Sequence, residues 1–241
     1  MRRISFIFCI AVLSSVAVTA ESGIPPEVPK QLEDAVVFDQ DDDFVGSYRI
    51  TISSLVQKPN GKSREETHVE ADVVKNNDGT TQRRLLTYIE NGADVTEKER
   101  SKFESENGDR DDDHDDDLAD PFGNEADRYS FGSVESRGSM RVIVFEPAPG
   151  HEDDDDIARG TIAWDAGSLE PRWLEMEAVH PPKPLKELRM RMEFQQIEDA
   201  LFLSRLVTDG LAKILLLKRE FHAEIRFDDI RPGAKHAESA D

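Results

Sequence analysis

The residues best suited to chemistry are carboxylates, which gather in two acidic runs. The first lies within residues 108–127 and contains Asp111-Asp112-Asp113-His114-Asp115-Asp116-Asp117, and the second lies at 150–156 and contains Glu152 to Asp156. Ca²⁺ prefers carboxylate oxygens, and four aspartates of the first run have the ligand spacing of a calcium loop: Asp109, Asp111, Asp113 and Asp120. The glycine that such a loop needs is replaced by His114, and no clear helix pair flanks the run. We therefore interpret both runs as solvated loops, compatible at most with weak, diffuse cation binding.

Other residue patterns that support catalysis do not occur in the sequence. The six histidines stand far apart, without the spacing of a histidine metal site: His68, His114, His151, His180, His222 and His236. No nucleophile elbow, phosphate-binding loop or dinucleotide fingerprint is present. A single cysteine cannot form a disulfide framework or a cysteine zinc site. We predict that the protein is not an enzyme and holds no metal or cofactor.

The charge balance excludes another class of partner. The 51 acidic side chains outnumber the 30 basic ones, which gives a formal net charge of −21. Binding to DNA or RNA depends on clustered lysines and arginines that neutralise phosphates. We therefore predict no nucleic-acid partner.

The first twenty residues have the layout of a secretory signal peptide. Arg2 and Arg3 form a basic start, Ile4 to Val18 is apolar, and Val18-Thr19-Ala20 supplies small residues for cleavage. The apolar part is shorter than the roughly 20 residues that a spanning helix needs. We predict cleavage after Ala20, a periplasmic or otherwise exported protein, and a mature chain that does not span a membrane. Residues 21–43 follow as an acidic leader that contains prolines.

From Phe44 onward, apolar and polar residues alternate, which is typical of β-strands. Tyr48, Ile50 and Ile52 open this pattern, and Asn60-Gly61 marks the first turn. We predict about ten strands at the following positions: 44–57, 69–73, 82–90, 128–135, 140–145, 157–165, 172–179, 186–196, 200–207 and 211–227. One helix is predicted over Thr96 to Glu106, with Phe103 as its apolar anchor.

These elements predict a mainly β fold. A long antiparallel meander with one apolar face must curl or close to cover that face and its edges. We therefore expect a curled antiparallel sheet, an incomplete β-barrel with one or two short covering helices, as a single domain over residues 44–231. A two-sheet sandwich is the alternative. Residues 232–241 form a polar tail.

The order of these segments resembles the outer-membrane lipoprotein-sorting, or LolA-like, family, of which the chain would be an extended member. The similar motifs are the helix entry Asn91-Gly92-Ala93-Asp94-Val95-Thr96-Glu97, the hairpin from Gly160 to Glu175, and the closing Phe227-Asp228-Asp229-Ile230-Arg231. The resemblance implies an incomplete barrel whose apolar cavity carries lipoprotein acyl chains, and possible contacts with envelope transport proteins. The acidic runs depart from the family pattern.

A stripe of apolar residues on the predicted strands supplies the candidate ligand-binding site. Its members are Ile50, Ile52, Leu174, Met176, Leu188, Met190, Met192, Phe194, Phe221 and Ile225. Methionine side chains adapt to varied apolar ligands. The sequence thus favours a carrier of lipid or lipoprotein acyl chains, with the predicted helix gating entry. The alternative is a non-enzymatic interaction or scaffold protein of the cell envelope, with the same fold and a filled core.

Overall fold

The computed structural model describes residues 24–32, 44–105, 118–123, 125–198, 200–214 and 217–233. The predicted signal peptide, most of the leader, the run from Asp111 to Asp117 and most of the polar tail lie outside the described residues. Predictions about those segments therefore remain predictions.

Most of the described chain forms strands. These are β1 (Gly46–Gln57), β2 (Glu65–Lys75), β3 (Thr81–Glu90), β4 (Ala93–Asp94), β5 (Tyr129–Phe131), β6 (Glu135–Arg137), β7 (Met140–Pro147), β8 (Ala158–Asp165), β9 (Pro171–Ala178), β10 (Leu185–Ile197), β11 (Ala200–Ile214) and β12 (Leu217–Pro232). The helical elements are η1 (Lys30–Leu32), α1 (Thr96–Ser105) and η2 (Ala126–Arg128).

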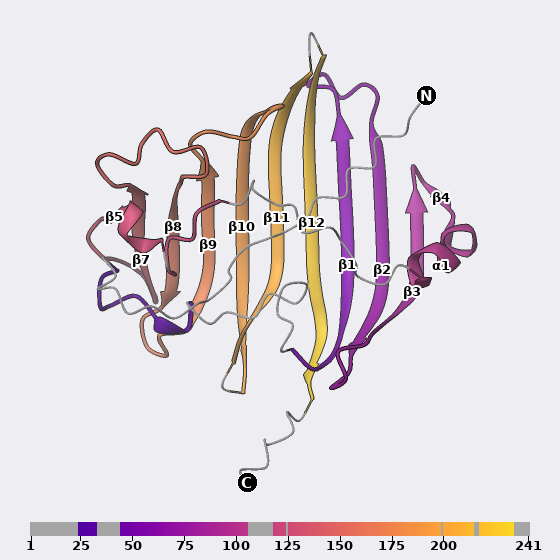
Figure 1. The fold of residues 1–241 in the computed structure, drawn as a ribbon, viewed down its shortest axis with the longest axis horizontal. Coiled ribbons are helices and arrows are strands. Elements are labelled where there is room, and N and C mark those ends of the chain that lie inside the picture. The colour runs from indigo at the N-terminus through magenta and orange to yellow at the C-terminus, as the bar shows by residue number, and fades with distance from the viewer. Residues whose placement is uncertain are drawn as a thin grey trace.

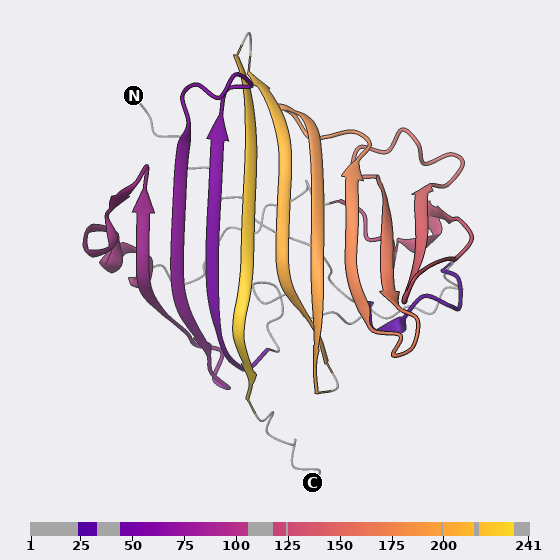
Figure 2. The same ribbon diagram turned by 180° about the vertical axis from the view of Figure 1, so that it is seen from behind.

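All the strands belong to one antiparallel sheet. Their order is β4-β3-β2-β1-β12-β11-β10-β9-β8-β7-β5, and β6 also pairs with β7. Among the described residues the two ends of this order do not pair with each other, so the sheet is open rather than a closed barrel. Figures 1 and 2 show it as one broad curved layer, with the short strands β4 and β5 at opposite sides. The predicted fold class is confirmed, and the chain does not form the sandwich alternative.

The last hairpin differs from the predicted strand boundaries. The sequence predicts strands over 200–207 and 211–227, with residues 208–210 between them. The structure instead continues β11 through these residues to Ile214. Gly210 pairs with Phe221 of β12, and a Cβ at Gly210 would lie 2.1 Å from the Phe221 ring. The glycine therefore makes room for an aromatic ring inside the sheet, which sequence alone does not distinguish from a turn.

The helix α1 covers the outer edge of β3. The Arg100 guanidinium donates to the Leu85 carbonyl at 2.9 Å, and the Leu85 N–H donates to Glu104 Oε1 at 3.2 Å. The Tyr88 N–H donates to Thr96 Oγ1 at 2.8 Å. These bonds satisfy backbone groups that an edge strand otherwise leaves open to pairing with another chain. The predicted helix is confirmed, and its contacts make it an edge cover.

Candidate functional site: the concave apolar face

Strand pairing brings the predicted apolar stripe together into continuous rows. Directly paired residues of neighbouring strands point to the same face of a sheet. One such row crosses the sheet from β2 to β7 and consists of Val69, Ile52, Ile225, Leu206, Met192, Leu174, Ile162 and Ile143. We call it the central row. A parallel row contains Ala223, Thr208, Met190, Met176 and Phe145.

All ten predicted site residues belong to the apolar packing on this face. Ile50, Leu174, Met176, Met192 and Phe194 are buried in the main core, and Ile52, Met190 and Ile225 pack against it while partly exposed. Leu188 and Phe221 form a smaller cluster with Ala178. The structure thus unites the stripe that periodicity predicted. Whether a ligand occupies it is a separate question.

Segments from outside the long strands cover one part of this face. Val28 and Leu32 from the η1 segment, and Ala119 and Phe122 from residues 118–123, are buried in the same core. The Phe122 and Tyr129 rings each meet Phe145 edge-on, with ring centroids 5.6 Å apart. We call the concave side of β7, β8 and β9 the packed part. Here Phe145, Ile162 and Trp164 are completely buried.

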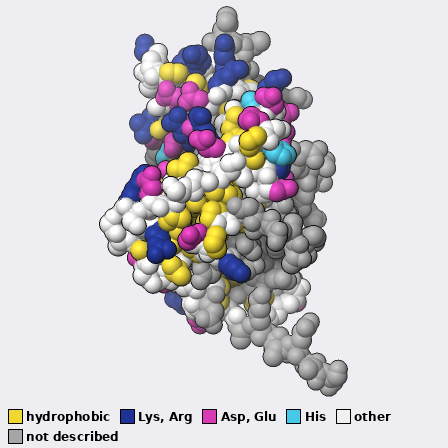
Figure 3. All heavy atoms as spheres, turned by 90° about the vertical axis from the view of Figure 1, so that its left-hand side faces the viewer, with side chains coloured by type: hydrophobic (Ala, Val, Ile, Leu, Met, Phe, Trp, Pro, Cys, Tyr) yellow, Lys and Arg dark blue, Asp and Glu magenta, His cyan; other side chains and the backbone are white. Residues whose placement is uncertain are grey.

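Tyr48 and Ile50 of β1 and Phe221 and Phe227 of β12 are buried, but the middle of the concave side of these two strands differs from the packed part. Ile52, Ser54, Ala223 and Ile225 are all only half-buried. We call this the half-buried part. Figure 3, which looks at the β5–β7 end of the sheet, shows hydrophobic side chains gathered in the middle of that end, beside a field of mixed charges.

Residues 118–123 were not among the predicted core residues, because they follow directly on an acidic run. The signal that could have found them is the apolar group Leu118-Ala119 and Pro121-Phe122, which interrupts the carboxylates. Ala119 and Phe122 are 2% and 3% exposed. The Tyr129 hydroxyl fixes this segment by donating to the Ala119 carbonyl at 2.7 Å, and burial raises the pKa of that hydroxyl.

The second acidic run has a structural role that composition did not reveal. Arg128, whose side chain is 17% exposed, lies among three carboxylates. Its Nη1 donates to Glu125 at 2.6 Å and to Asp156 at 2.8 Å, and its Nη2 donates to Asp154 at 3.0 Å. The Ala119 N–H also donates to the Asp156 carbonyl at 2.8 Å. We call this group the Arg128 clamp, and it ties the acidic loop to the segment that covers the packed part.

The clamp shifts the titration of its carboxylates. The pKa of Asp156 is lowered chiefly by the hydrogen bond from Arg128. The pKa of Asp154 is lowered first by its hydrogen bond with His151 and then by Arg128. The pKa of Arg128 is raised by the same contacts. Each shift favours the charged form of both partners, so the clamp is an ion-pair network at neutral pH.

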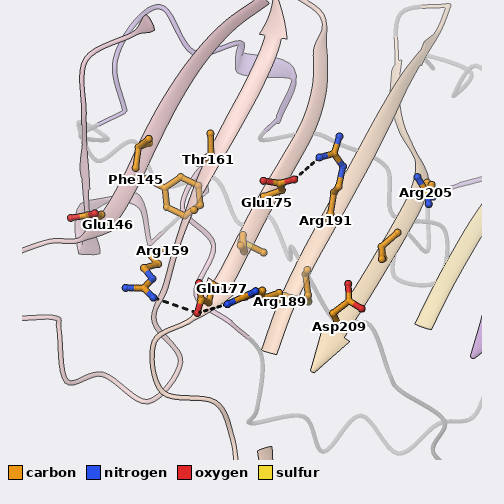
Figure 4. A pocket seen from close by; sticks show the side chains of 15 residues that line it. Phe145, Glu146, Arg159, Thr161, Glu175, Glu177, Arg189, Arg191, Arg205 and Asp209 are labelled. Carbon is orange, nitrogen blue, oxygen red and sulfur yellow. Dashed lines mark hydrogen bonds and ion pairs between the residues drawn. The ribbon is translucent and has the colours of Figure 1, made fainter. Parts of the chain in front are cut away.

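The outer face of the sheet is polar and carries a groove of about 560 Å³. Its lining side chains alternate in charge from strand to strand, as Figure 4 shows. The paired positions from β8 to β12 are Arg159, Glu177, Arg189, Asp209 and His222. Arg159 and Arg189 lie 3.3 and 3.7 Å from the Glu177 carboxylate. Since these charges pair with one another, the groove has the character of a solvated outer surface.

Two further searches of the described residues gave no site. No group of three or more His, Cys, Asp and Glu side chains there is placed to hold a metal ion. No helix in the described part of the chain has the length and apolar character needed to cross a membrane.

Comparison with known proteins found likeness only among solved structures. No family model and no curated protein matches the chain. It is similar to a DUF1329 family protein from Desulfovibrio piger, at 9% identity over 81% of this chain and 89% of that chain, with a TM-score of 0.35. It is also similar to an outer membrane lipoprotein-sorting protein domain from Vibrio parahaemolyticus, at 12% identity over 79% and 88%, with a TM-score of 0.31.

The family that the sequence motifs resemble is therefore among these structures. A third similar structure is the MucA/MucB complex of Pseudomonas aeruginosa, at 11% identity over 82% of this chain and 95% of that chain, with a TM-score of 0.19. At these TM-scores we infer neither a ligand nor a partner from the likeness.

Proposed function

We propose that this protein is an exported, periplasmic carrier that holds acyl chains of lipids or lipoproteins against its concave apolar face. The central row supports the proposal, because it presents an unbroken line of apolar side chains from Val69 to Ile143 across an open sheet. Adjacent strands lie about 4.8 Å apart, so the part of the row from β12 to β8 extends about 19 Å. That length suits an extended acyl chain.

The energetics need no catalytic group. Each methylene that moves from water to an apolar surface gains about 0.8 kcal/mol, so a long chain binds through burial alone. The half-buried side chains Ile52, Met190 and Ile225 still have surface to offer, and methionine adapts to ligands of different shape. We propose that an acyl chain first contacts the protein at these three residues.

The structure suggests a different entrance from the one that the sequence predicted. The helix α1 is hydrogen-bonded to the β3 edge through Arg100, Glu104 and Thr96, so we do not assign it the role of a gate. The segments at 24–32 and 118–123 contact the concave face directly and contribute only a few buried side chains each. We propose that an acyl chain enters between these segments and the sheet.

A matched pair of variants on β1 tests the site. Ile52 faces the concave side and Leu55 lines an outer groove, yet both are half-buried on the same strand. The mature protein is purified from its host and examined by lipid mass spectrometry, and the delipidated protein is titrated with a fluorescent acyl chain. We expect Ile52→Glu to weaken acyl binding at least tenfold and Leu55→Glu to leave it within about twofold, since a buried charge without a partner is costly.

The outcomes separate the carrier from other functions. Co-purified lipid and a selective effect of Ile52→Glu support the carrier. An empty protein that takes up no acyl chain contradicts it. Equal losses in both variants would instead indicate a general loss of stability, which thermal unfolding of each variant measures directly.

A scaffold or interaction function is the second candidate, and one observation favours it. The packed part is already filled by the chain's own side chains, with Phe145, Ile162 and Trp164 completely buried. A protein whose whole concave face is filled would have no room for a ligand and would act through its surface. Failure of acyl binding in the test above, together with an intact fold, would favour this candidate.

A further inference from the structure

We propose that Trp164 is the hydrogen-bond donor that selects acyl chains carrying a carbonyl group, such as esters and amides. The proposal rests on the carrier function proposed above and names the polar group that its ligand would present. Three observations on β8 support it, and each concerns the placement of one indole ring.

The first observation is an unused donor. Trp164 is completely buried, yet its indole Nε1 has no hydrogen-bond partner among the described residues. The other two buried polar atoms without a described partner, Gln196 Oε1 and Arg219 Nη1, belong to side chains that are only half-buried. A buried tryptophan N–H nearly always finds an acceptor. The described residues thus leave an N–H donor unsatisfied within the apolar core.

The second observation is the position of the ring. Trp164 belongs to the same core as the central-row residues Ile162 and Leu174. It is two residues along β8 from Ile162, so its backbone lies about 7 Å from the β8 member of the central row. A chain that runs along the row from β12 to β8 would bring its head group to this end. The donor therefore lies where a carbonyl next to an acyl chain would arrive.

The third observation is a local irregularity that orients the ring. The pairing of β8 with β9 shifts between Ala163 and Trp164, so that Trp164 lies opposite Pro171 rather than Arg172. Irregularities of this kind redirect a side chain and are common next to functional sites. Pro171 is itself almost completely buried and has no N–H of its own. The bulge thus sets the indole-bearing residue opposite a residue that has no N–H to compete for a carbonyl.

Ligand binding would relieve the cost of this arrangement. An unsatisfied buried donor is destabilising, whereas the same donor bonded to a carbonyl makes a favourable contact. An alkyl chain without a carbonyl gains the apolar burial but leaves the indole N–H unsatisfied. The difference between these two ligands is the specificity that we assign to Trp164.

The test compares two pyrene-labelled probes of equal length, a fatty-acid methyl ester and an alkane. We expect Trp164→Phe to weaken ester binding about three- to tenfold, the value of one hydrogen bond between neutral groups, and to leave alkane binding within about twofold. Trp173→Phe is the matched control, because Trp173 contacts Arg191 on the outer face, with the guanidinium carbon 4.9 Å from the ring centre. It should change neither affinity.

A second measurement does not depend on how well Trp164→Phe folds. The wild-type protein contains two tryptophans, so ¹⁵N labelling gives two indole N–H signals that Trp173→Phe assigns. We expect the Trp164 signal to move downfield with the ester and not with the alkane. A bound ester that leaves this signal in place, or a Trp164→Phe variant that loses both probes equally, would overturn the proposal while the carrier function stands. If neither probe binds the wild-type protein, the carrier function itself fails.

Discussion

The two parts of the concave face are built from the same alternating strands, yet they differ in how they are covered. In the packed part, the Phe122, Tyr129 and Phe131 rings pack against Phe145 of β7, and Ile162 is completely buried. In the half-buried part, Ile52 and Ile225 keep part of their surface. The comparison teaches that strand periodicity decides which face is apolar, whereas segments between the strands decide how much of that face remains for a ligand.

Two glycines compare the rigidity of the packed part with that of β11, which pairs with β12. A Cβ at Gly160 on β8 would lie 2.0 Å from the Glu175 carbonyl oxygen and 2.5 Å from the Phe145 ring. A Cβ at Gly210 on β11 would first meet the Phe221 ring, at 2.1 Å, and then the Glu187 carbonyl oxygen, at 2.7 Å. The clash with a backbone carbonyl is closer at Gly160 than at Gly210, and backbone cannot move aside as easily as a ring. We therefore expect Gly160→Ala to destabilise by about 3 kcal/mol and Gly210→Ala by about 1–2 kcal/mol.

Urea unfolding of both variants measures the difference. Gly132→Ala serves as the control, because the nearest atom to its added Cβ is the Val144 carbonyl oxygen at 3.5 Å, an ordinary contact. Equal destabilisation at Gly160 and Gly210 would show that β8 and β11 are equally tight at these positions. The greater rigidity that we assign to the packed part would then be wrong.

The sequence predicted the sheet well because strand periodicity repeats over many residues. Leu188, Met190, Met192 and Phe194 of β10 alternate without interruption, and pairing then forces their neighbours onto the same face. The cover of the packed part was not predictable in the same way. Phe122 lies in a short apolar group inside an acidic stretch, and its burial depends on Phe145, which is distant in sequence.

The Arg128 clamp was likewise hidden from sequence analysis, since its members lie on two separate segments. Glu125 precedes Arg128 by three residues, whereas Asp154 and Asp156 come from the second acidic run. From its composition we interpreted the second acidic run as a solvated loop. In the structure, its Asp154 and Asp156 side chains are both bonded to Arg128. The indole of Trp164 shows the same limit, because nothing in the sequence reveals that its N–H lacks an acceptor.

Removal of the clamp should loosen the packed part specifically. We expect Arg128→Met to destabilise the protein by about 2 kcal/mol, because it leaves three carboxylates close together without their cation. This value is below that for a fully buried ion pair, since the carboxylate side chains are 36–40% exposed. Hydrogen exchange should show faster opening at Ala119 and Ala158 than at the β1–β12 pairing. Equal acceleration in both regions would indicate that the clamp stabilises the sheet as a whole.

The pH dependence of stability should reveal the same clamp. The pKa values of Asp154 and Asp156 are lowered from the usual 3.8 in the folded state, so the unfolded chain binds protons at higher pH than the folded chain does. Their contribution is therefore present above the ordinary carboxyl pKa and is lost as pH falls through the folded values. We expect the free energy of unfolding to change little from pH 7 to about pH 5 and to fall below that.

The clamp variant provides the control for this pH effect. In Arg128→Met, the fall in stability between about pH 5 and pH 3 should be shallower than in the wild-type protein, because both aspartates lose their bonds from Arg128, while Asp154 keeps its hydrogen bond with His151. Asp78, Asp94 and Asp165 also have lowered pKa values through local hydrogen bonds, and their contribution remains in both proteins. Parallel pH profiles for the two proteins would remove the clamp from the explanation.

The outer face should give the smallest effect, although it carries the most regular pattern of charges. Arg189 is 62% exposed and lies 3.7 Å from Glu177, which also contacts Arg159 at 3.3 Å. Exposed pairs of this kind contribute little, because water screens the attraction and both side chains lose freedom. We expect Arg189→Met to change the free energy of unfolding by less than about 0.5 kcal/mol, measured by urea unfolding at low and high salt. A loss as large as that in Arg128→Met would show that the outer charges hold the sheet together as firmly as the clamp does, and the distinction between a partly buried network and a solvated one would no longer explain where this protein is rigid.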